Sequence, residues 1–145
     1  MEENQLQLNS EAKHFMSEIG KWAYFLSIVG FVMVGLFVLI AIFAGSIFSM
    51  MGNTMGGAMG SAGIMGSVLT VVYLLCALIY FFPVYYLNRF AAKVKTAIHQ
   101  NDSSVLTEAL QYLKSHYKFL GILTIIALAF YSIVIIFSVI GFAGR

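Results

Sequence analysis

Three long stretches of this chain lack charged residues and histidine, and they cover residues 22–50, 66–87 and 119–144. Each exceeds the roughly 20 apolar residues that a helix needs to cross the hydrocarbon core of a bilayer. Charged residues make up only 10% of the chain and hydrophobic residues 61%, whereas an average soluble protein is roughly 25% charged. A helix on the surface of a soluble protein needs a polar face. The missing charge therefore excludes a soluble protein and predicts an integral membrane protein.

The same absence limits what the protein can do. Ionisable side chains inside a membrane usually mark ion paths, proton relays or catalytic sites, and the three stretches contain none. The sequence also has no phosphate-binding glycine motif, no nucleophile–base pairing and no paired carboxylates. The single cysteine, Cys76, lies inside the second stretch, where burial disfavours reactivity and packing is the expected role. We expect no enzyme activity, no cofactor and no nucleic-acid partner.

What charge there is predicts an orientation. Seven of the eight Lys and Arg residues lie before the first stretch or between the second and third: Lys13, Lys21, Arg89, Lys93, Lys95, Lys114 and Lys118. The segment 51–65 between the first two stretches carries no charge. Positive residues accumulate on the cytoplasmic side of membrane proteins. Aromatic rings such as Trp22 and Tyr86 gather at the same proposed interface, so we expect a cytoplasmic N-terminus and an external C-terminus.

The predicted fold class is an all-α membrane protein that forms one domain over residues 1–145. It has three transmembrane helices, an N-terminal interfacial helix, and a cytoplasmic helical hairpin between spans two and three. The predicted segments are an amphipathic helix at 10–21, span one at 22–50, a Gly/Met-rich external loop at 51–65, span two at 66–87, the hairpin at 88–118 and span three at 119–144.

Helix ends and faces support this division. Asn9 or Ser10 can cap a helix that starts at Glu11. Both arms of the hairpin carry apolar residues at three- and four-residue spacing, and the turn at 101–104 is short enough to make the arms antiparallel. We expect the arms to bury four of these side chains against each other: Val94, Ile98, Leu106 and Leu110.

Small residues predict where helices pack. Ala41, Gly45 and Ser49 repeat every four residues, and Gly52, Gly56 and Gly60 continue the same spacing. Such a stripe lets another helix approach closely in a bilayer. Glycine also favours flexible loops, so segment 51–65 is predicted as a loop that becomes helical near residue 62, with a tight helix contact as the alternative.

Two further sets carry structural predictions. Pro83 is the only proline, and its ring removes the backbone hydrogen bond to the carbonyl of Ile79, so we expect a kink in span two. The basic residues beside spans two and three are expected to contact anionic lipid head groups; they are Arg89, Lys93, Lys95, Lys114 and Lys118.

Two groups of possible metal ligands need weighing. Met51, Met55 and Met59 repeat every four residues, and thioethers suit Cu(I). They have no neighbouring His or Cys, and methionine is an ordinary packing residue, so adaptable packing is favoured over copper binding. The three histidines, His14, His99 and His116, all fall in the proposed cytoplasmic layer. They lack paired ligand spacing, so solvated side chains are favoured over a metal or pH-sensing site.

Three stretches carry a resemblance to a known family: GKWAYFLSIVGF (20–31), YFFPVYYLNRFAAKVKTAI (80–98) and NDSSVLTEALQYLKSHYKFLGILTIIALAFY (101–131). Together they resemble an uncharacterised family of small bacterial inner-membrane proteins that is common in Bacteroidetes and labelled as a domain of unknown function. The resemblance implies a bacterial cytoplasmic membrane. It brings no activity and no active-site residues.

Two functions remain as hypotheses. The first is a non-enzymatic membrane protein that acts through helix–helix contacts, as a homo-oligomer or an accessory subunit of a membrane complex. The second is an oligomeric channel or transporter for a small solute. Its available lining is neutral and comprises Ser27, Ser46, Thr70, Tyr73, Thr124, Tyr131, Ser132 and Ser138; ion coupling would lack a carrier group.

Overall fold

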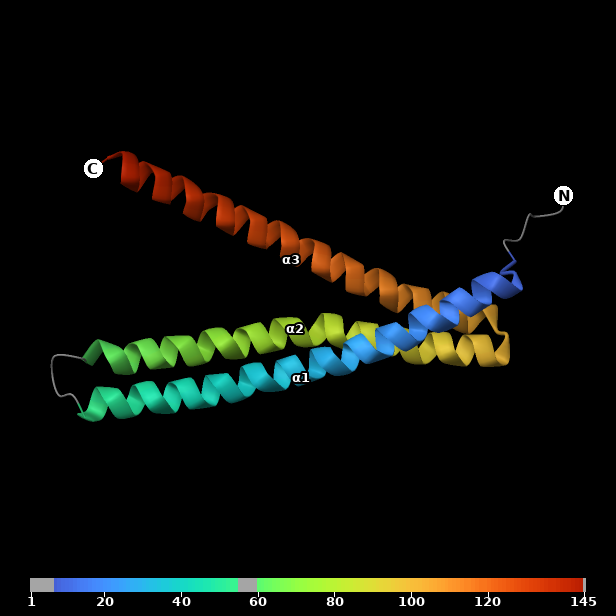
Figure 1. Cartoon of the computed structure of the whole chain (residues 1–145), viewed down its shortest axis with the longest axis horizontal. Helices are drawn as coiled ribbons and strands as arrows, with labels where there is room; N and C mark the ends of the chain where they lie inside the picture. Colours follow the sequence, from blue (N-terminus) through green and yellow to red (C-terminus); the bar gives the residue numbers. More distant parts are fainter. Residues whose placement is uncertain (1–6, 55–59, 145) are drawn as a thin grey trace.

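Three long helices make up the fold. The computed structural model describes residues 7–54 and 60–144, and its helices are α1 (Ser10–Thr54), α2 (Gly60–Gln100) and α3 (Ser103–Ala143) (Figure 1). All three are long and apolar enough to cross a membrane. With 45, 41 and 41 residues, each spans about 60 Å or more, roughly twice the thickness of a hydrocarbon core. Each helix is therefore long enough to extend beyond a bilayer.

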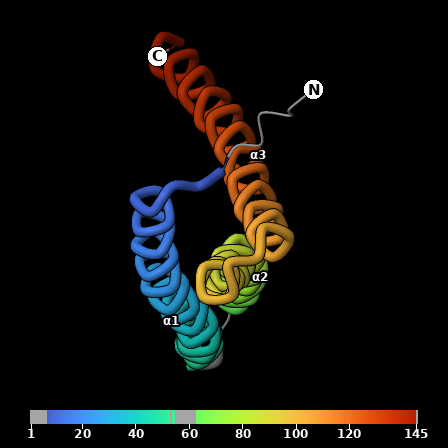
Figure 2. The backbone as a smooth tube through the Cα atoms, turned by 90° about the vertical axis from the view of Figure 1, so that its right-hand side faces the viewer, coloured from blue at the N-terminus to red at the C-terminus, as the bar shows by residue number. Residues whose placement is uncertain are grey.

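Consecutive helices run in opposite directions along the molecule. The start of α1 and the turn between α2 and α3 lie at one end of the molecule, which we call the hairpin end (Figure 1). The end of α1, the start of α2 and the C-terminal end of α3 lie toward the opposite end, which we call the far end. Viewed along α2, α1 and α3 lie on different sides of it (Figure 2). Within the described residues, α2 contacts both other helices, and no Cα of α1 lies within 8 Å of a Cα of α3.

The first helix begins where the sequence predicts. The Asn9 side-chain oxygen accepts a hydrogen bond from the Ala12 backbone N–H at 2.8 Å, so Asn9 supplies the cap. From Ser10 the helix continues without a break to Thr54. The predicted amphipathic segment 10–21 is thus the first part of α1 and runs directly into the first apolar stretch.

A row of mostly small residues joins α1 to α2, and we call this contact the α1–α2 seam. Its α1 positions recur at spacings of three and four and are all buried or half-buried: Gly20, Ala23, Ser27, Gly30, Val34, Phe37, Ala41 and Gly45. That spacing matches the seam of a coiled coil, in which one stripe of each helix faces its partner. Small side chains on this stripe let the two backbones approach closely.

The glycines show how tight the seam is. A Cβ added to Gly30 would lie 2.5 Å from Val84 Cγ2, and one added to Gly66 would lie 2.5 Å from Phe48 Cβ. Closer to the far end, the Thr70 hydroxyl lies against Gly45. The same hydroxyl is within hydrogen-bond distance of the Ala41 carbonyl, at 3.2 Å. Side chains beyond glycine would force the helices apart at these points.

The predicted packing stripe has its partner within the same chain. Ala41 is fully buried and Gly45 lies against α2, whereas Ser49 is exposed. Gly52 is half-buried near the end of α1, and Gly60 is the first residue of α2. Gly56 lies outside the described residues. The close contact therefore covers the first two positions of the predicted stripe and excludes Ser49.

The structure differs from the predicted loop at 51–65. Helix α1 extends to Thr54 and α2 starts at Gly60, so most of this glycine-rich segment is helical. Directly after the segment, Gly66 is buried against Phe48, so the two helices pack closely at this point. A glycine that fits a helix contact can offset its poor intrinsic helix propensity.

The turn between α2 and α3 has only two residues, fewer than the predicted 101–104. Asn101 adopts a left-handed backbone conformation with φ of 53°. The Asp102 N–H then donates to the Ala97 carbonyl at 3.1 Å, which is the bond that closes a Schellman motif. Asp102 also caps α3 by accepting from the Ser104 N–H. One residue therefore ends α2 and the next begins α3.

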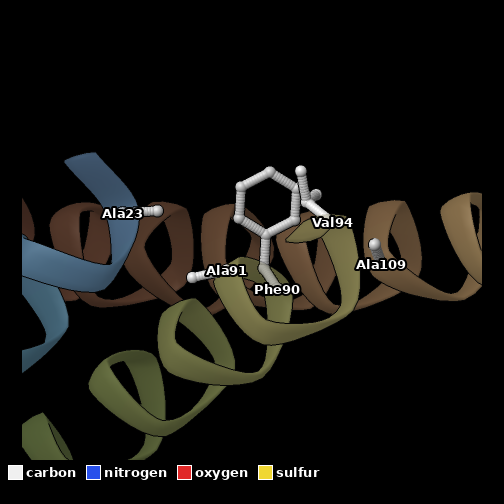
Figure 3. Packing of buried hydrophobic residues seen from close by; sticks show 5 residues of the cluster. All are labelled: Ala23, Phe90, Ala91, Val94 and Ala109. Carbon is white, nitrogen blue, oxygen red and sulfur yellow. The ribbon is translucent and has the colours of Figure 1, made fainter. Parts of the chain in front are cut away.

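A small hydrophobic core holds the hairpin end together (Figure 3). Its buried members are Ala23 from α1, Phe90, Ala91 and Val94 from α2, and Ala109 from α3. Of the expected contacts, Val94 is fully buried, whereas Leu110 is 43% exposed. The inward residue on α3 is the adjacent Ala109, which is completely buried. The predicted hairpin packing is thus present, and Ala109 of the predicted apolar face is the inward residue in place of Leu110.

The C-terminal part of α3 stands apart from the rest. Every residue from 124 to 144 is exposed, and Figure 1 shows this part of α3 diverging from α2 toward the far end. We call residues 124–143 the outer segment of α3. It includes large apolar side chains such as Phe137 and Phe142, which are 72% and 88% exposed. The chain itself leaves this segment without a packing partner among the described residues.

The seam predicts different outcomes at two glycines of α1. Gly45→Ile should weaken the α1–α2 contact, because the new side chain meets Thr70. We expect a loss of about 1–3 kcal/mol, as for other overpacked contacts. Gly35→Ile is the matched control, because a Cβ there meets no described atom within 4 Å. Thermal unfolding in mild detergent compares the two. Equal stability of both variants would show that the seam is not the contact described.

Candidate functional site

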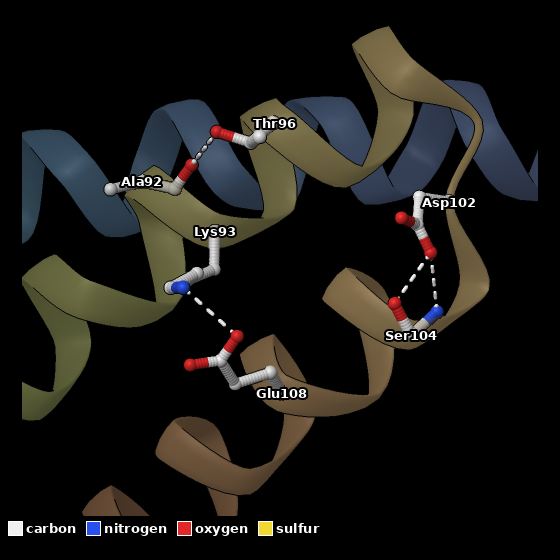
Figure 4. Close-up of polar contacts among 6 residues, drawn as sticks. All are labelled: Ala92, Lys93, Thr96, Asp102, Ser104 and Glu108. Atoms are coloured by element: carbon white, nitrogen blue, oxygen red, sulfur yellow. Dashed lines mark hydrogen bonds and ion pairs between the residues drawn. The ribbon is translucent and has the colours of Figure 1, made fainter.

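Polar contacts between elements concentrate at the hairpin end. Lys93 Nζ of α2 lies 2.9 Å from Glu108 Oε2 of α3 (Figure 4). Lys13 Nζ of α1 donates to Asn101 Oδ1 in the turn at 2.6 Å. Both bonds are exposed, so each adds little to the unfolding free energy, typically about 0–1 kcal/mol for a surface ion pair. The Lys13 bond links α1 to the turn, and the Lys93–Glu108 pair links α2 to α3.

A partly buried polar pair lies inside the α1–α2 seam. Ser27 is fully buried, and its hydroxyl donates to the Tyr24 carbonyl at 2.7 Å. The same oxygen accepts a hydrogen bond from Asn88 Nδ2 at 2.9 Å. Ser27 was one of the candidates for a neutral pore lining, and Asn88 had no predicted role. The structure instead uses both groups to satisfy each other between two helices, as buried polar groups require.

His116 joins α3 to α2 at the proline. Its Nδ1 atom lies 2.7 Å from the Pro83 carbonyl oxygen. A carbonyl can only accept, so Nδ1 carries the proton in this contact. Pro83 is buried, and α2 continues as one helix on both sides of it. A Pro–His contact of this kind between distant segments could not be read from residue spacing.

The three histidines do not come together. His14 is exposed and lies 3.5 Å from Glu18 on the same helix, while His99 lines a cavity between α1 and α2. Over residues 7–54 and 60–144, no group of three His, Cys, Asp or Glu side chains could hold a metal ion. Of the methionines weighed for copper, Met51 is 44% exposed at the end of α1. Met55 and Met59 lie outside the described residues.

The basic residues at this end divide into separate environments. Arg89 donates to the Tyr85 hydroxyl at 3.1 Å, and its guanidinium carbon lies 5.4 Å from the centre of that ring. This hydrogen bond raises the pKa of Arg89. Lys93 is paired with Glu108. Lys114 and Lys118 are exposed on α3. The five basic residues grouped by sequence are therefore not equivalent.

Lys95 belongs to a cavity between α1 and α2. The cavity has a volume of about 610 Å³ and lies beside the N-terminal part of α1. It is lined by Ser17, Gly20, Lys21, Tyr24, Ala91, Ala92, Lys95, Ile98 and His99. The walls combine two lysines and a histidine with apolar and small residues. Such a combination can bind an anionic group that carries an apolar part.

Hydroxyl groups in the apolar stretches bond within their own helices. Ser46, Thr124, Ser132 and Ser138 each donate to the backbone carbonyl four residues earlier, at 2.8–2.9 Å. A hydroxyl with this bond has satisfied its only donor. These side chains were candidates for a neutral pore lining, and within one chain each donates its hydrogen bond inside its own helix.

Asp102 is the acidic group with a defined role in the turn. Its side-chain oxygen accepts from the Ser104 hydroxyl at 2.6 Å and from the Ser104 backbone N–H at 2.8 Å (Figure 4). These bonds favour the ionised carboxylate, so they lower the pKa of Asp102 below its ordinary value of 3.8. The contribution of this cap is thus tied to its charge.

The fold defines the class of protein: an all-helical chain with three helices able to span a membrane. Residues 45–139 match a family described as a family of unknown function, DUF5362, and this is more than half of the chain. The chain belongs to that family. The match takes in the end of α1, all of α2 and most of α3. Comparison with curated proteins and with solved structures gave no match.

The Asp102 cap predicts a dependence on pH. A carboxylate with a lowered pKa in the folded state stabilises the fold fully above its unfolded value, and this contribution falls as the pH drops through the folded value. Helix unfolding should therefore become easier below about pH 3.8. In Asp102→Asn the amide cannot titrate, so that part of the loss should vanish. Circular dichroism of both proteins in detergent between pH 7 and pH 2 provides the measurement, and superimposable profiles would contradict this role.

Proposed function

We propose that this protein is a non-enzymatic integral membrane protein that acts through helix–helix contacts. It serves as a homo-oligomer or as an accessory subunit of a larger membrane complex. The observation that supports this function is the outer segment of α3, in which every side chain is exposed. The other two helices already have each other as partners along the α1–α2 seam.

The division of labour between the helices supports this function. The seam keeps α1 and α2 in close contact from Gly20 of α1, at the hairpin end, to Gly66 of α2, at the far end. This pair of helices can therefore act as a membrane anchor. The hairpin core and the Lys93–Glu108 pair attach only the first part of α3 to that anchor. The outer segment is left to project beside the pair. In a bilayer such a helix gains from packing against another helix wherever small residues allow close approach.

The outer segment has the residues for such packing. It contains Ala127, Ala129, Ser132, Ser138 and Gly141 among larger apolar side chains. A Cβ added to Gly141 would meet no described atom within 4 Å. Small residues of this kind form the contact surfaces of membrane helices, because association there depends on close packing and not on escape from water. The segment can thus receive a helix from a second copy or from another membrane protein.

The proposed placement puts the hairpin end in the cytoplasm and the far end outside. Its basis is the basic residues, because seven of eight Lys and Arg belong to segments at the hairpin end. The proposed membrane is the bacterial cytoplasmic membrane, as the resemblance of the three sequence stretches implies.

The assembly function predicts a periodic response in α3. Single Trp substitutions at each position from 125 to 136 should weaken assembly where the side chain faces the partner, with a repeat of about 3.6 residues. The readout is the number of chains per nanodisc, counted by photobleaching, together with co-purified proteins identified by mass spectrometry. Leu39→Trp and Ile42→Trp on exposed positions of α1 are the matched controls, and both should assemble normally. The function would be refuted if no substitution over 125–136 changed assembly and the unchanged chain had one copy per nanodisc and no co-purified protein.

The placement predicts opposite labelling of two positions. Single cysteines at Ser61 and Ser103, in a Cys76→Ala background, are treated with a membrane-impermeant thiol reagent. Ser61→Cys should react in intact spheroplasts, because it belongs to the far end. Ser103→Cys, at the start of α3, should react only after lysis. Labelling of both before lysis, in spheroplasts shown to be sealed, would exclude three spans with a cytoplasmic N-terminus.

A further inference from the structure

We propose that the cavity between α1 and α2 at the hairpin end binds the phosphate head group of an anionic phospholipid. This inference uses the membrane placement proposed above and adds a ligand to it. The cavity of about 610 Å³ falls within the usual range for small-molecule sites, roughly 300–1,000 Å³. It is distinct from the outer segment of α3, since α3 contributes no lining residue.

The lining residues suit a phosphate group. Lys21 of α1 and Lys95 of α2 both line the cavity, so each of the two helices that form it contributes one positively charged residue. Among the described residues, neither lysine has a carboxylate within 4 Å. Tyr24, Ser17 and His99 add hydrogen-bonding groups. Phosphate oxygens form short, charge-assisted hydrogen bonds with such donors. The cavity thus has positive charge with no anion from the described chain to neutralise it.

Small and apolar residues form part of the cavity lining. Gly20 faces Val94 and Ala91, and a Cβ on Gly20 would lie 3.2 Å from Val94 Cγ1. Ala91, Ala92 and Ile98 provide an apolar wall on α2. An inorganic anion makes no apolar contact with such a wall, whereas the glycerol and first acyl carbons of a lipid can pack against it and bury its apolar surface. The mixed lining therefore favours an amphiphile over a fully polar anion.

The position in the fold also indicates a lipid. Tyr24 lines the cavity and Trp22 directly follows the lining residue Lys21; these two aromatic residues are 54% and 67% exposed. Amphipathic rings of this type are enriched at the level of the lipid head groups. The first apolar stretch starts at Trp22, so Lys21 lies at the proposed membrane surface. A head group at this level can reach the cavity without leaving the bilayer.

The remaining basic residues provide a matched comparison. Arg89 and Lys93 are engaged by Tyr85 and Glu108. Lys114 and Lys118 are exposed on α3 and do not line the cavity between α1 and α2. A general attraction of lysines to an anionic surface would act on Lys114 and Lys118 as well. A specific site in the cavity would instead depend on Lys21 and Lys95 and not on Lys114 and Lys118.

The test measures lipid binding to the full chain in detergent by native mass spectrometry. The probes are phosphatidylglycerol, phosphatidylcholine and glycerol 3-phosphate. We expect phosphatidylglycerol to bind best and Lys21→Gln/Lys95→Gln to lower its affinity at least tenfold. The control Lys114→Gln/Lys118→Gln removes the same charge and should stay within twofold of the unchanged chain. Ala92→Leu, which narrows the cavity and keeps both lysines, should also lower the affinity.

Several results would overturn the site. Equal losses in the two double variants would show diffuse attraction only. Binding of glycerol 3-phosphate as tight as that of the lipid would identify a soluble phosphate compound as the ligand. An unchanged affinity in Lys21→Gln/Lys95→Gln, with a melting temperature equal to that of the unchanged chain, would remove the role of the cavity. Chain counting on the same samples keeps this question separate from assembly, because lipid binding can fail while the oligomer persists.

Discussion

The close approach of α1 and α2 is the constraint on which the rest of the structure depends. Glycine at positions 30, 45 and 66 leaves room for the facing side chains Val84, Thr70 and Phe48. In a bilayer, lipid solvates apolar side chains as well as another helix does, so packing at short range must supply the stability. Bulky residues in the seam would separate α1 from α2. The cavity beside Gly20 and the surface that α3 contacts would then be lost as well.

The third helix is attached to this pair through a shorter contact. Ala109 packs into the hairpin core, and His116 reaches the carbonyl of Pro83. Beyond these contacts α3 separates from α2, and its outer segment is exposed throughout. The molecule thus combines an anchored pair of helices with a third helix that is attached at one end. This asymmetry places the proposed lipid site and the proposed assembly surface on different parts of the chain.

Sequence reasoning predicted the features that depend on composition and local chemistry. Three apolar helices, the Asn9 cap and a packed hairpin all follow from hydropathy, capping and periodicity. It missed features that depend on which residues meet across helices. Residues 51–54 and 60–65 of the glycine-rich segment are helical, and the Ser27–Asn88 bond joins residues 61 positions apart. Ala109 and Leu110 both belong to the apolar face of this arm, and periodicity alone does not determine which of two adjacent residues is buried.

The most direct test of this account is a comparison of two interhelical distances by pulsed electron paramagnetic resonance. Spin labels at Ile47 and Val68 report on α1 and α2, and labels at Val68 and Ile133 report on α2 and α3; all three positions are exposed. The measurement uses a Cys76→Ala chain diluted to one copy per nanodisc. The first pair should give a short, narrow distribution, as expected for axes about 8–10 Å apart. The second should be clearly longer, because α3 stands away from the seam. Equal, short distances for both pairs would show a closed three-helix bundle and contradict the account.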